Sequence, residues 1–286
     1  MNFTKLQSVG NDFILVEASG QHRNWSQLAM AICQRHFGVG CDGLLLLLPS
    51  EEADFAMRVF NADGSETEAC GNGLRCLVKY VIDRGLANTG VDEISVATIA
   101  GVRKAKLIKE ADKITKIQVG MGIPEFDARN IPVAVEPNKV KLVDIRLISD
   151  YPVNVGGREL SLSFVSLGNP HAIYFWQWPV SEFPLSRLGP AVEQHKLFPN
   201  RVNFEVANVT SRKQIEARVW ERGVSETLAC GSGACAVAVT AQMLGYVDNR
   251  VDIKLPGGIL EVEWDRVGEV LLSGPAEIVF TGQWPN

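Results

Sequence analysis

The 286-residue sequence predicts an α/β protein built from two similar barrel-like halves, each a curved sheet around a central helix. Two observations lead to this expectation. Residues 65–73 read SETEACGNG, and residues 225–233, at an offset of 160, read SETLACGSG, with seven of nine positions identical. Short alternating apolar segments, bounded by Gly, Pro, Asn and Asp, fill much of the remaining chain, as is typical of strands. A repeat of this length indicates two copies of one structural unit.

The repeat extends beyond the motif. The offset of 160 also pairs Gly85 with Gly245, RV at 58–59 with RV at 218–219, and VD at 91–92 with VD at 251–252; slightly out of step, SVGN at 8–11 returns as SLGN at 166–169. Two copies can pack about a pseudo-twofold axis. Such packing would bring Cys70 and Cys230 face to face across one cavity.

Each copy of the motif opens a predicted helix. The run 234–244 is apolar nearly all round, which is typical of a buried helix. Gly85 and Gly245 then stand where a C-terminal cap belongs. In the first copy, apolar residues follow the spacing of one helical face at Leu74, Leu77, Val78, Val81 and Ile82.

The remaining segments are read as strands. The stretch 124–137 contains three prolines and little pattern, so we expect the first copy to hand over to the second there. The apolar run 44–48 predicts a buried strand. Further strands are predicted at 13–16, 57–60, 94–96, 117–119, 172–175, 217–220 and 270–272.

Composition excludes several classes of protein. Hydrophobic residues make up 46% and charged residues 21%, as in a globular protein without disorder bias. A net charge of −5 without a basic run argues against a nucleic-acid partner. No apolar stretch reaches membrane-spanning length, and the first residues lack a signal-peptide pattern, so a cytoplasmic location is the expectation.

The six cysteines have neither zinc-site spacing nor a histidine pair beside them, so we expect no metal. An even count in a reducing cytoplasm is not evidence for disulfides. Cys33 and Cys41 are interpreted as small buried hydrophobic residues, and Cys76 and Cys235 as packing residues inside the two helices.

The two Cys-Gly-x-Gly turns carry the predicted chemistry. A helix N-terminus presents unpaired N–H groups and a partial positive charge, so each turn can bind a carboxylate. The same field lowers the pKa of a cysteine placed there. Two such thiols on opposite sides of an α-carbon could remove its proton from one face and return it on the other. Cys70 or Cys230 alone would be read as a buried helix-start residue; the duplication favours catalysis.

Other polar residues have two readings each. Asn11, Asn61, Asn169 and Asn203 stand in turn contexts, where Asn suits the backbone. His171 is either a proton relay for a cysteine or a hydrogen-bonded core histidine.

Charged residues flank both motifs. Glu221 and Arg222 either recognise a second ammonium and carboxylate on the substrate or form a surface ion pair. Glu66 and Glu226 are assigned to hydrogen bonding at the helix entries.

These motifs together resemble the diaminopimelate epimerases, nearly from end to end. The matching segments are GNDF (10–13), FGVGCDG (37–43), FNADGSE (60–66), ACGNGLRC (69–76), GNPH (168–171), FP (198–199), VN (202–203), WERG (220–223) and ACGSGAC (229–235). The two cysteine motifs are the most specific of these. The chain departs from the usual family pattern at Ser8-Val9, Ser225 and Ser232, none of which removes a catalytic element.

The resemblance implies a cofactor-independent (PLP-independent) isomerase of lysine and peptidoglycan-precursor biosynthesis that interconverts LL- and meso-diaminopimelate. It implies that Cys70 and Cys230 are the paired base and acid, and it places His171 and Glu221 near them. The reacting carboxylate would be held by the backbone of Gly71, Asn72, Gly231 and Ser232. The rest of the substrate would be held by Asn11, Asn61, Asn169, Asn203, Glu221 and Arg222.

The resemblance also implies two pseudo-symmetric, mainly antiparallel domains, of residues 1–124 plus 277–286 and of residues 125–276, with the active site in the cleft between them. A strand near 278–280 would cross back to the first domain, and the protein would be a homodimer. The rivals are a proline or hydroxyproline epimerase of the same fold, a thiol redox protein, and a non-catalytic amino-acid binder.

Overall fold

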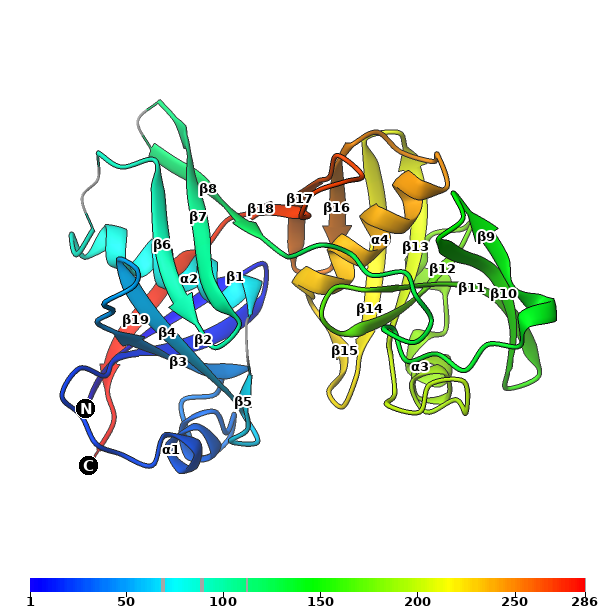
Figure 1. The fold of residues 1–286 in the computed structure, drawn as a ribbon. Helices are drawn as coiled ribbons and strands as arrows, with labels where there is room; N and C mark the ends of the chain where they lie inside the picture. Colours follow the sequence, from blue (N-terminus) through cyan, green and yellow to red (C-terminus); the bar gives the residue numbers. More distant parts are fainter. Residues whose placement is uncertain (68–69, 88–89, 112, 286) are drawn as a thin grey trace. The chain divides into compact units, whose positions relative to one another are not determined.

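The computed structural model describes residues 1–67, 70–87, 90–111 and 113–285 and divides the chain into two units (Figure 1). Unit 1 comprises Met1–Gly120 and Ser273–Asn286, and unit 2 comprises Met121–Leu272. Strand β18 (Leu271–Gly274) spans the second boundary.

Unit 1 holds nine strands of its own and two α-helices among the described residues. Its sheet runs β19–β1–β2–β3–β4, and β4 also pairs with β5 and with β6, which leads to β7 and β8. Only β2/β3 and β4/β6 are parallel among these pairs. The elements are β1 (Asn2–Ser8), β2 (Asn11–Glu17), α1 (Trp25–Ile32), β3 (Gly43–Leu48), β4 (Phe55–Asn61), β5 (Glu66–Thr67), α2 (Gly71–Asp83), β6 (Glu93–Thr98), β7 (Gly101–Glu110), β8 (Lys113–Gly120) and β19 (Glu277–Gln283).

Unit 2 repeats this topology. Its sheet runs β9–β10–β11–β12–β13–β14, and β14 also pairs with β15 and with β16, which leads to β17. Two of these pairs are parallel, β12/β13 and β14/β16. They correspond to β2/β3 and β4/β6 in unit 1. The elements are η1 (Pro137–Lys139), β9 (Lys141–Val143), β10 (Leu147–Val155), β11 (Arg158–Ser166), β12 (Pro170–Phe175), η2 (Val180–Glu182), α3 (Leu185–Glu193), β13 (Asn203–Ser211), β14 (Gln214–Glu221), β15 (Ser225–Thr227), α4 (Gly231–Met243), β16 (Arg250–Leu255) and β17 (Gly258–Glu263).

The predicted fold class is confirmed: each unit is a mainly antiparallel sheet that packs around one helix. Helix α2 contacts seven strands of unit 1, namely β1, β2, β3, β4, β7, β8 and β19. Helix α4 contacts β11, β12, β13, β14, β16 and β17 in unit 2. The sheet of unit 1 takes its edge strand β19 from the C-terminal end of the chain, in the position that β10 occupies in unit 2.

The two central helices follow the predicted patterns. Helix α2 buries ten of its thirteen residues, including the predicted apolar positions from Leu74 to Ile82. Helix α4 buries twelve of thirteen, because its sequence has no polar face. Both helices are followed by a glycine with positive φ, +66° at Gly85 and +75° at Gly245, a backbone conformation that glycine adopts without steric cost.

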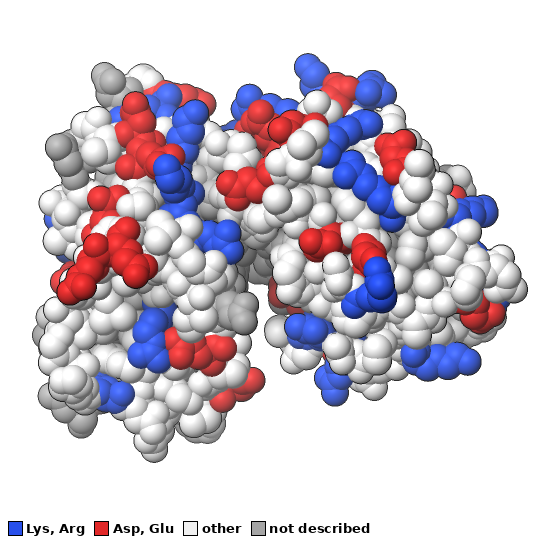
Figure 2. All heavy atoms as spheres, viewed as in Figure 1, with Lys and Arg blue, Asp and Glu red and all other residues white. Residues whose placement is uncertain are grey.

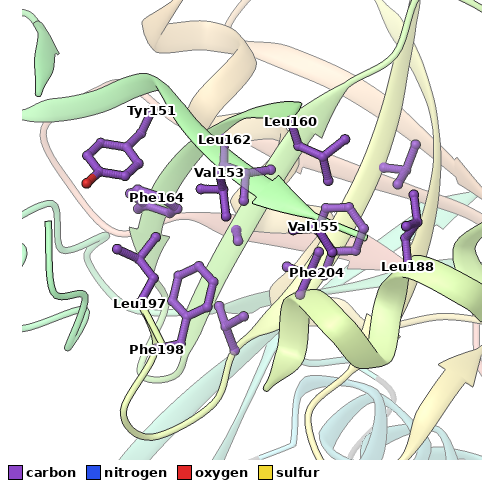
Figure 3. Close-up of a cluster of buried hydrophobic side chains, with 14 of the residues drawn as sticks. Tyr151, Val153, Val155, Leu160, Leu162, Phe164, Leu188, Leu197, Phe198 and Phe204 are labelled. Carbon is purple, nitrogen blue, oxygen red and sulfur yellow. The ribbon is translucent and has the colours of Figure 1, made fainter. Parts of the chain in front are cut away.

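Two further helices were not predicted, and both cover the outside of a sheet. Helix α1 buries only Trp25, Ala29 and Ile32. Helix α3 contains Gly189 and Pro190, which weaken a helical pattern, but its apolar side joins a core built from β10, β11 and β13 (Figure 3). In that core Phe164, Phe198 and Phe204 are fully buried or nearly so.

The molecular surface mixes charges of both signs. On the face shown in Figure 2, basic and acidic side chains are interspersed. Within the described ranges, no helix is long and apolar enough to cross a membrane.

Candidate functional site

Both cysteines of the repeated motif are helix N-caps. Cys70 precedes α2 with extended backbone angles (φ −143°, ψ 109°), and Cys230 precedes α4 with similar angles (φ −125°, ψ 119°). Each Sγ accepts a hydrogen bond from the backbone N–H three residues on, at 3.4 Å from Gly73 N and from Gly233 N. The thiols therefore lie at the positive ends of the two central helices, beside the first-turn N–H groups that a carboxylate can use.

In unit 1, the first turn of α2 is joined to the end of β1 and the start of β2. The buried side chain of Asn72 donates from Nδ2 to Asn11 Oδ1 at 2.9 Å. Asn11 in turn donates from Nδ2 to Asp42 Oδ2 at 2.7 Å. The structure thus brings two of the predicted binding residues together.

A buried cation lies beneath this pair. The guanidinium of Arg75 is fully buried and donates to Asn72 Oδ1 and, at 3.0 Å, to Ser8 Oγ. Arg75 therefore fixes the orientation of the Asn72 amide, with its oxygen toward the guanidinium and its nitrogen toward Asn11.

Asp42 was missed by the sequence analysis as a site residue. Its signal was its position between Cys41 and Gly43, at the start of the buried strand β3, inside a segment already matched to the family. Its carboxylate also accepts the Asp12 N–H at 3.1 Å and pairs with Arg35 at 2.8 Å.

The neighbouring Asp12 forms ion pairs with Lys5 at 2.5 Å and with Arg35 at 3.1 Å. Burial acts to raise the pKa of Asp12, but hydrogen bonds and charges from these two cations outweigh burial and lower that pKa below its ordinary value of 3.8. The segment that carries Asn11 is therefore held by charged groups.

Asn61 ends β4 and is exposed, and its Nδ2 donates to Ser65 Oγ at 2.9 Å within the β4–β5 hairpin. By the repeat offset its counterpart is Glu221, which ends β14 and accepts from Thr227 Oγ1 at 2.5 Å. Both predicted residues thus occupy the strand ends that lead toward the cysteine turns.

In unit 2, polar side chains form a chain that starts at Cys230. Its Sγ lies 3.4 Å from Ser232 Oγ, and Asn169 Nδ2 lies 3.4 Å from the same Oγ. His171 Nε2 lies 2.9 Å from Asn169 Oδ1, and His171 Nδ1 lies 2.7 Å from Glu205 Oε1. His171 and Glu205 are both fully buried. Four predicted residues, Cys230, Ser232, Asn169 and His171, are therefore connected by hydrogen bonds, and the chain ends at Glu205, which was not predicted.

The predicted lowering of the thiol pKa is wrong for Cys230. Burial raises the pKa of this thiol well above its ordinary value, and the negative charges of Glu221 and Glu205 add to the rise. Hydrogen bonds from Ser232 and the Gly233 N–H oppose burial but do not overcome it. Unit 2 therefore holds Cys230 as a thiol, the form that can donate a proton.

Asn203 shapes the adjacent turn. Its Nδ2 donates to the Pro170 carbonyl at 3.0 Å, and its Oδ1 accepts the Arg222 backbone N–H at 2.9 Å. Glu193, which the sequence analysis did not single out, accepts the next N–H, from Gly223, at 2.9 Å. The backbone at Arg222 is thus fixed on both sides, while its guanidinium bonds to the Asn200 carbonyl at 3.3 Å.

Two other interpretations are decided by contacts. The carboxylates of Glu66 and Glu226 pair with Arg58 at 2.6 Å and Arg218 at 2.7 Å, across the hairpins before the turns, and within the part of the chain that the structure describes neither bonds to a helix entry. The caps are provided by the cysteines instead. Cys76 is fully buried, and burial raises its pKa, in agreement with a packing role.

The chain is similar to one family of known proteins over nearly its whole length. The family model described as diaminopimelate epimerase matches residues 3–126 and 163–279. The diaminopimelate epimerase of Pelotomaculum thermopropionicum is 43% identical over 288 residues, covering 100% of this chain and 99% of that protein. The one from Acetivibrio thermocellus is 44% identical over 285 residues, covering 99% and 98%.

Solved structures with a similar fold include proteins that are described differently. A probable proline racemase from Agrobacterium radiobacter matches with a TM-score of 0.69 at 13% identity, covering 99% of this chain and 92% of that one. A PhzF-family phenazine biosynthesis protein from Bacillus anthracis matches with a TM-score of 0.67 at 17% identity, covering 99% and 98%. At such identities the similarity shows the fold alone.

Proposed function

Because this chain belongs to the diaminopimelate epimerase family, we propose that it interconverts LL- and meso-2,6-diaminopimelate by inverting one α-carbon, without a cofactor. The observation that carries the proposal is the pair of cysteines at equivalent helix N-termini in two repeated units. Each supplies a sulfur and the N–H groups of a helix start, which suits proton transfer next to a carboxylate.

The reaction needs one thiolate and one thiol. One sulfur takes the α-proton as the Cα–H bond breaks, and the other thiol gives its proton to the opposite face of the same carbon. The substrate gains and loses one proton, and the two sulfurs exchange protonation states. Cys70 and Cys230 therefore exchange the roles of base and acid with the handedness of the substrate.

Charge that builds on the reacting carboxylate is stabilised by backbone N–H groups at Gly71, Asn72, Gly231 and Ser232. These residues form the first turns of α2 and α4. The proposal requires the α-carbon to bind with one cysteine turn on each side, in a cleft between the domains of residues 1–124 plus 277–286 and of residues 125–276.

The distal half of the substrate carries a second ammonium and carboxylate. Glu221 and Arg222 have the charges to recognise them, supported by the fixed backbone of this turn. His171 and Glu221 also act on the protonation of Cys230. The amides of Asn11, Asn61, Asn72, Asn169 and Asn203 complete the proposed binding set, whether by direct contact or by holding the turns.

The same family membership supports a homodimer that works in the cytoplasm, in lysine and peptidoglycan-precursor biosynthesis. Proline racemases are the second candidate, because a probable member of that group shares the fold. The charged pair at 221–222 favours a substrate with two zwitterionic ends over proline.

The test is NMR of LL-diaminopimelate in D2O with the reduced protein and no added cofactor. The proposal expects deuterium at one α-carbon while the meso isomer accumulates. An unchanged spectrum with folded protein would reject diaminopimelate as substrate; turnover of proline or hydroxyproline in its place would establish the second candidate. Ligand binding without any exchange would indicate an amino-acid binder.

A further inference from the structure

One hydrogen-bonded chain in unit 2 extends beyond the residues that the proposed reaction uses. It runs from the sulfur of Cys230 through Ser232, Asn169 and His171 and ends at the carboxylate of Glu205. We propose that Glu205 is a positioning residue, which sets the direction of the hydrogen bond that reaches Cys230. The inference rests on the proposed function for its catalytic meaning, but its structural content stands without it.

The carboxylate of Glu205 determines which ring nitrogen of His171 carries the proton. Glu205 Oε1 lies 2.7 Å from His171 Nδ1, with both side chains fully buried. Burial raises the pKa of Glu205, while the charge of His171 and its hydrogen bond oppose this rise. When the carboxylate is ionised it only accepts hydrogen bonds, so it holds the proton of a neutral His171 imidazole on Nδ1. The Nε2 of His171 then carries a lone pair and must accept a hydrogen bond.

Because Nε2 of His171 accepts, the direction of each further hydrogen bond toward Cys230 is determined. In the structure the amide oxygen of Asn169 faces His171 Nε2 at 2.9 Å and its nitrogen faces Ser232, which is the orientation of the second state described below. An imidazole with its proton on Nδ1 requires the opposite orientation, reached by a half-turn of the amide, in which the NH2 of Asn169 donates to Nε2 and its oxygen faces Ser232. The Ser232 hydroxyl then donates to that oxygen and is left to accept the S–H of Cys230, 3.4 Å away. In this state each hydrogen bond of the chain joins one donor to one acceptor, and Cys230 is a thiol.

The chain has a second, fully reversed state with the same number of protons. When Cys230 is a thiolate, Ser232 donates to the sulfur, and the NH2 of Asn169 donates to Ser232. The Asn169 oxygen then accepts a proton carried on His171 Nε2, and Glu205 balances the charge of the imidazolium. The two states differ in one proton, on sulfur or on Nε2, and in a half-turn of one amide. Donation from Ser232 to the sulfur opposes the effect of burial, which raises the pKa of Cys230.

The surroundings of Glu205 also support a positioning role. Its second oxygen, Oε2, has no hydrogen-bond partner within the described part of the chain, although it is buried. A buried, half-satisfied carboxylate costs stability, so its presence is not explained by packing. A Cβ at Gly233 would lie 2.9 Å from Glu205 Oε1, so the glycine of the cysteine turn makes room for it.

The substitution Glu205→Gln tests this role. Glutamine can donate to Nδ1, which moves the imidazole proton to Nε2, turns Asn169, and directs the Ser232 hydroxyl toward the sulfur. The first readout is the tautomer of His171 by 15N NMR, with the signal assigned by its loss in His171→Asn. We expect the wild-type protein to show protonated Nδ1 and the variant to show protonated Nε2.

The second readout is the pH dependence of alkylation of Cys230 by iodoacetamide, followed on its peptide by mass spectrometry. Glu205→Gln should move the midpoint to lower pH by about one unit, since it both removes a charge and reverses the chain. Glu221, which also faces Cys230, is unchanged in this comparison. Glu205→Asp, which retains the carboxylate, should keep the wild-type tautomer.

Two controls distinguish an effect through this hydrogen-bonded chain from a general effect of removing a buried charge. Glu193→Gln removes another buried carboxylate of unit 2, bonded to Trp220 and Gly223, and should leave both readouts unchanged. In a Ser232→Ala background, Glu205→Gln should shift alkylation much less than it does with Ser232 present.

An unchanged tautomer in Glu205→Gln would overturn the inference, as would equal alkylation shifts with and without the Ser232 hydroxyl. Neither readout requires turnover, so failure of the epimerase proposal would be recognised separately, by the exchange experiment.

Discussion

Replacing Gly233 with alanine tests whether the cysteine turn of unit 2 depends on the carboxylate beneath it. The new Cβ would lie 2.9 Å from Glu205 Oε1 and 3.3 Å from Cys230 Cβ. The repeat offers a matched control in Gly73, where a Cβ would lie 2.9 Å from Leu45 Cδ2. Leu45 and Glu205 are themselves 160 positions apart, so the two substitutions differ mainly in the atom that they meet.

The expected difference in unfolding free energy depends on whether the atom that the new Cβ meets can move aside. Alanine in a helix gains up to about 1 kcal/mol over glycine, and overpacking costs about 1–3 kcal/mol. At Gly73 the end of an apolar side chain gives way, so the terms nearly cancel. At Gly233 the displaced atom is a carboxylate oxygen held 2.7 Å from His171, and disturbing a charged hydrogen bond costs about 1.5–3 kcal/mol more. We therefore expect Gly233→Ala to be about 2 kcal/mol less stable than Gly73→Ala.

Urea unfolding of both variants, followed by circular dichroism, measures the difference, with equal m-values required for the comparison. Equal stabilities would refute the reasoning, because they would mean that Glu205 moves aside without loss. A Gly73→Ala variant that is the less stable of the two would refute it as well.

Other outcomes follow from the same contacts. Cys70→Ala and Cys230→Ala should each reduce epimerisation by at least about 10²-fold in a coupled assay, since each removes one acid–base group; Cys76→Ala, buried and away from the reacting position, should keep most of the activity, and the reverse ranking would reject the two-thiol mechanism. The depressed pKa of Asp12 stabilises the fold above the ordinary value of 3.8 and ceases to do so as pH falls through the lower folded value. Unfolding measured from pH 5 to pH 3 should therefore show a smaller loss of stability for Asp12→Asn than for wild type, and parallel curves would contradict this.

The duplicated motif was enough to predict the architecture. Seven identical positions, two helices and two closing glycines at one offset left few alternatives for the halves. The two outer helices escaped prediction for local reasons. Helix α3 contains Gly189 and Pro190, and it forms because Leu185, Leu188 and Val192 are buried against the sheet, a tertiary effect that overrides propensity.

Site residues that lie within one short motif could be predicted from the sequence, whereas those that act through a distant partner could not. The cysteines and their turns can be read from nine residues. Asp42 and Glu205 could not be read in this way, because each acts through a partner 31 or 34 positions away. The direction of the Cys230 pKa was missed for the same reason: the helix field is a local property, whereas burial and Glu205 belong to the fold.

The two cysteine turns have the same backbone but opposite charges beneath them. Arg75, a fully buried cation, bonds to the turn that begins at Cys70, while Glu205, a fully buried carboxylate, contacts the chain that ends at Cys230. By the repeat offset, Arg75 aligns with Cys235 and Glu205 with Leu45, so neither charge has a counterpart in the other unit. Duplication thus supplies two turns of similar backbone, which we propose bind a carboxylate, and the buried charges at Arg75 and Glu205 give their two sulfurs different surroundings.

A reaction that needs one thiolate and one thiol benefits from this inequality, because two equivalent sulfurs would often carry the same charge. We expect the alkylation midpoint of Cys70 to lie at lower pH than that of Cys230 in the substrate-free protein. Comparing midpoints in pH, and not rates, removes the difference in exposure between the half-buried and the buried sulfur. The urea-unfolded protein provides the control, in which the two midpoints should coincide. If the midpoints of the folded protein also coincide, the buried charges do not distinguish the two thiols, and the inequality must arise only when substrate binds.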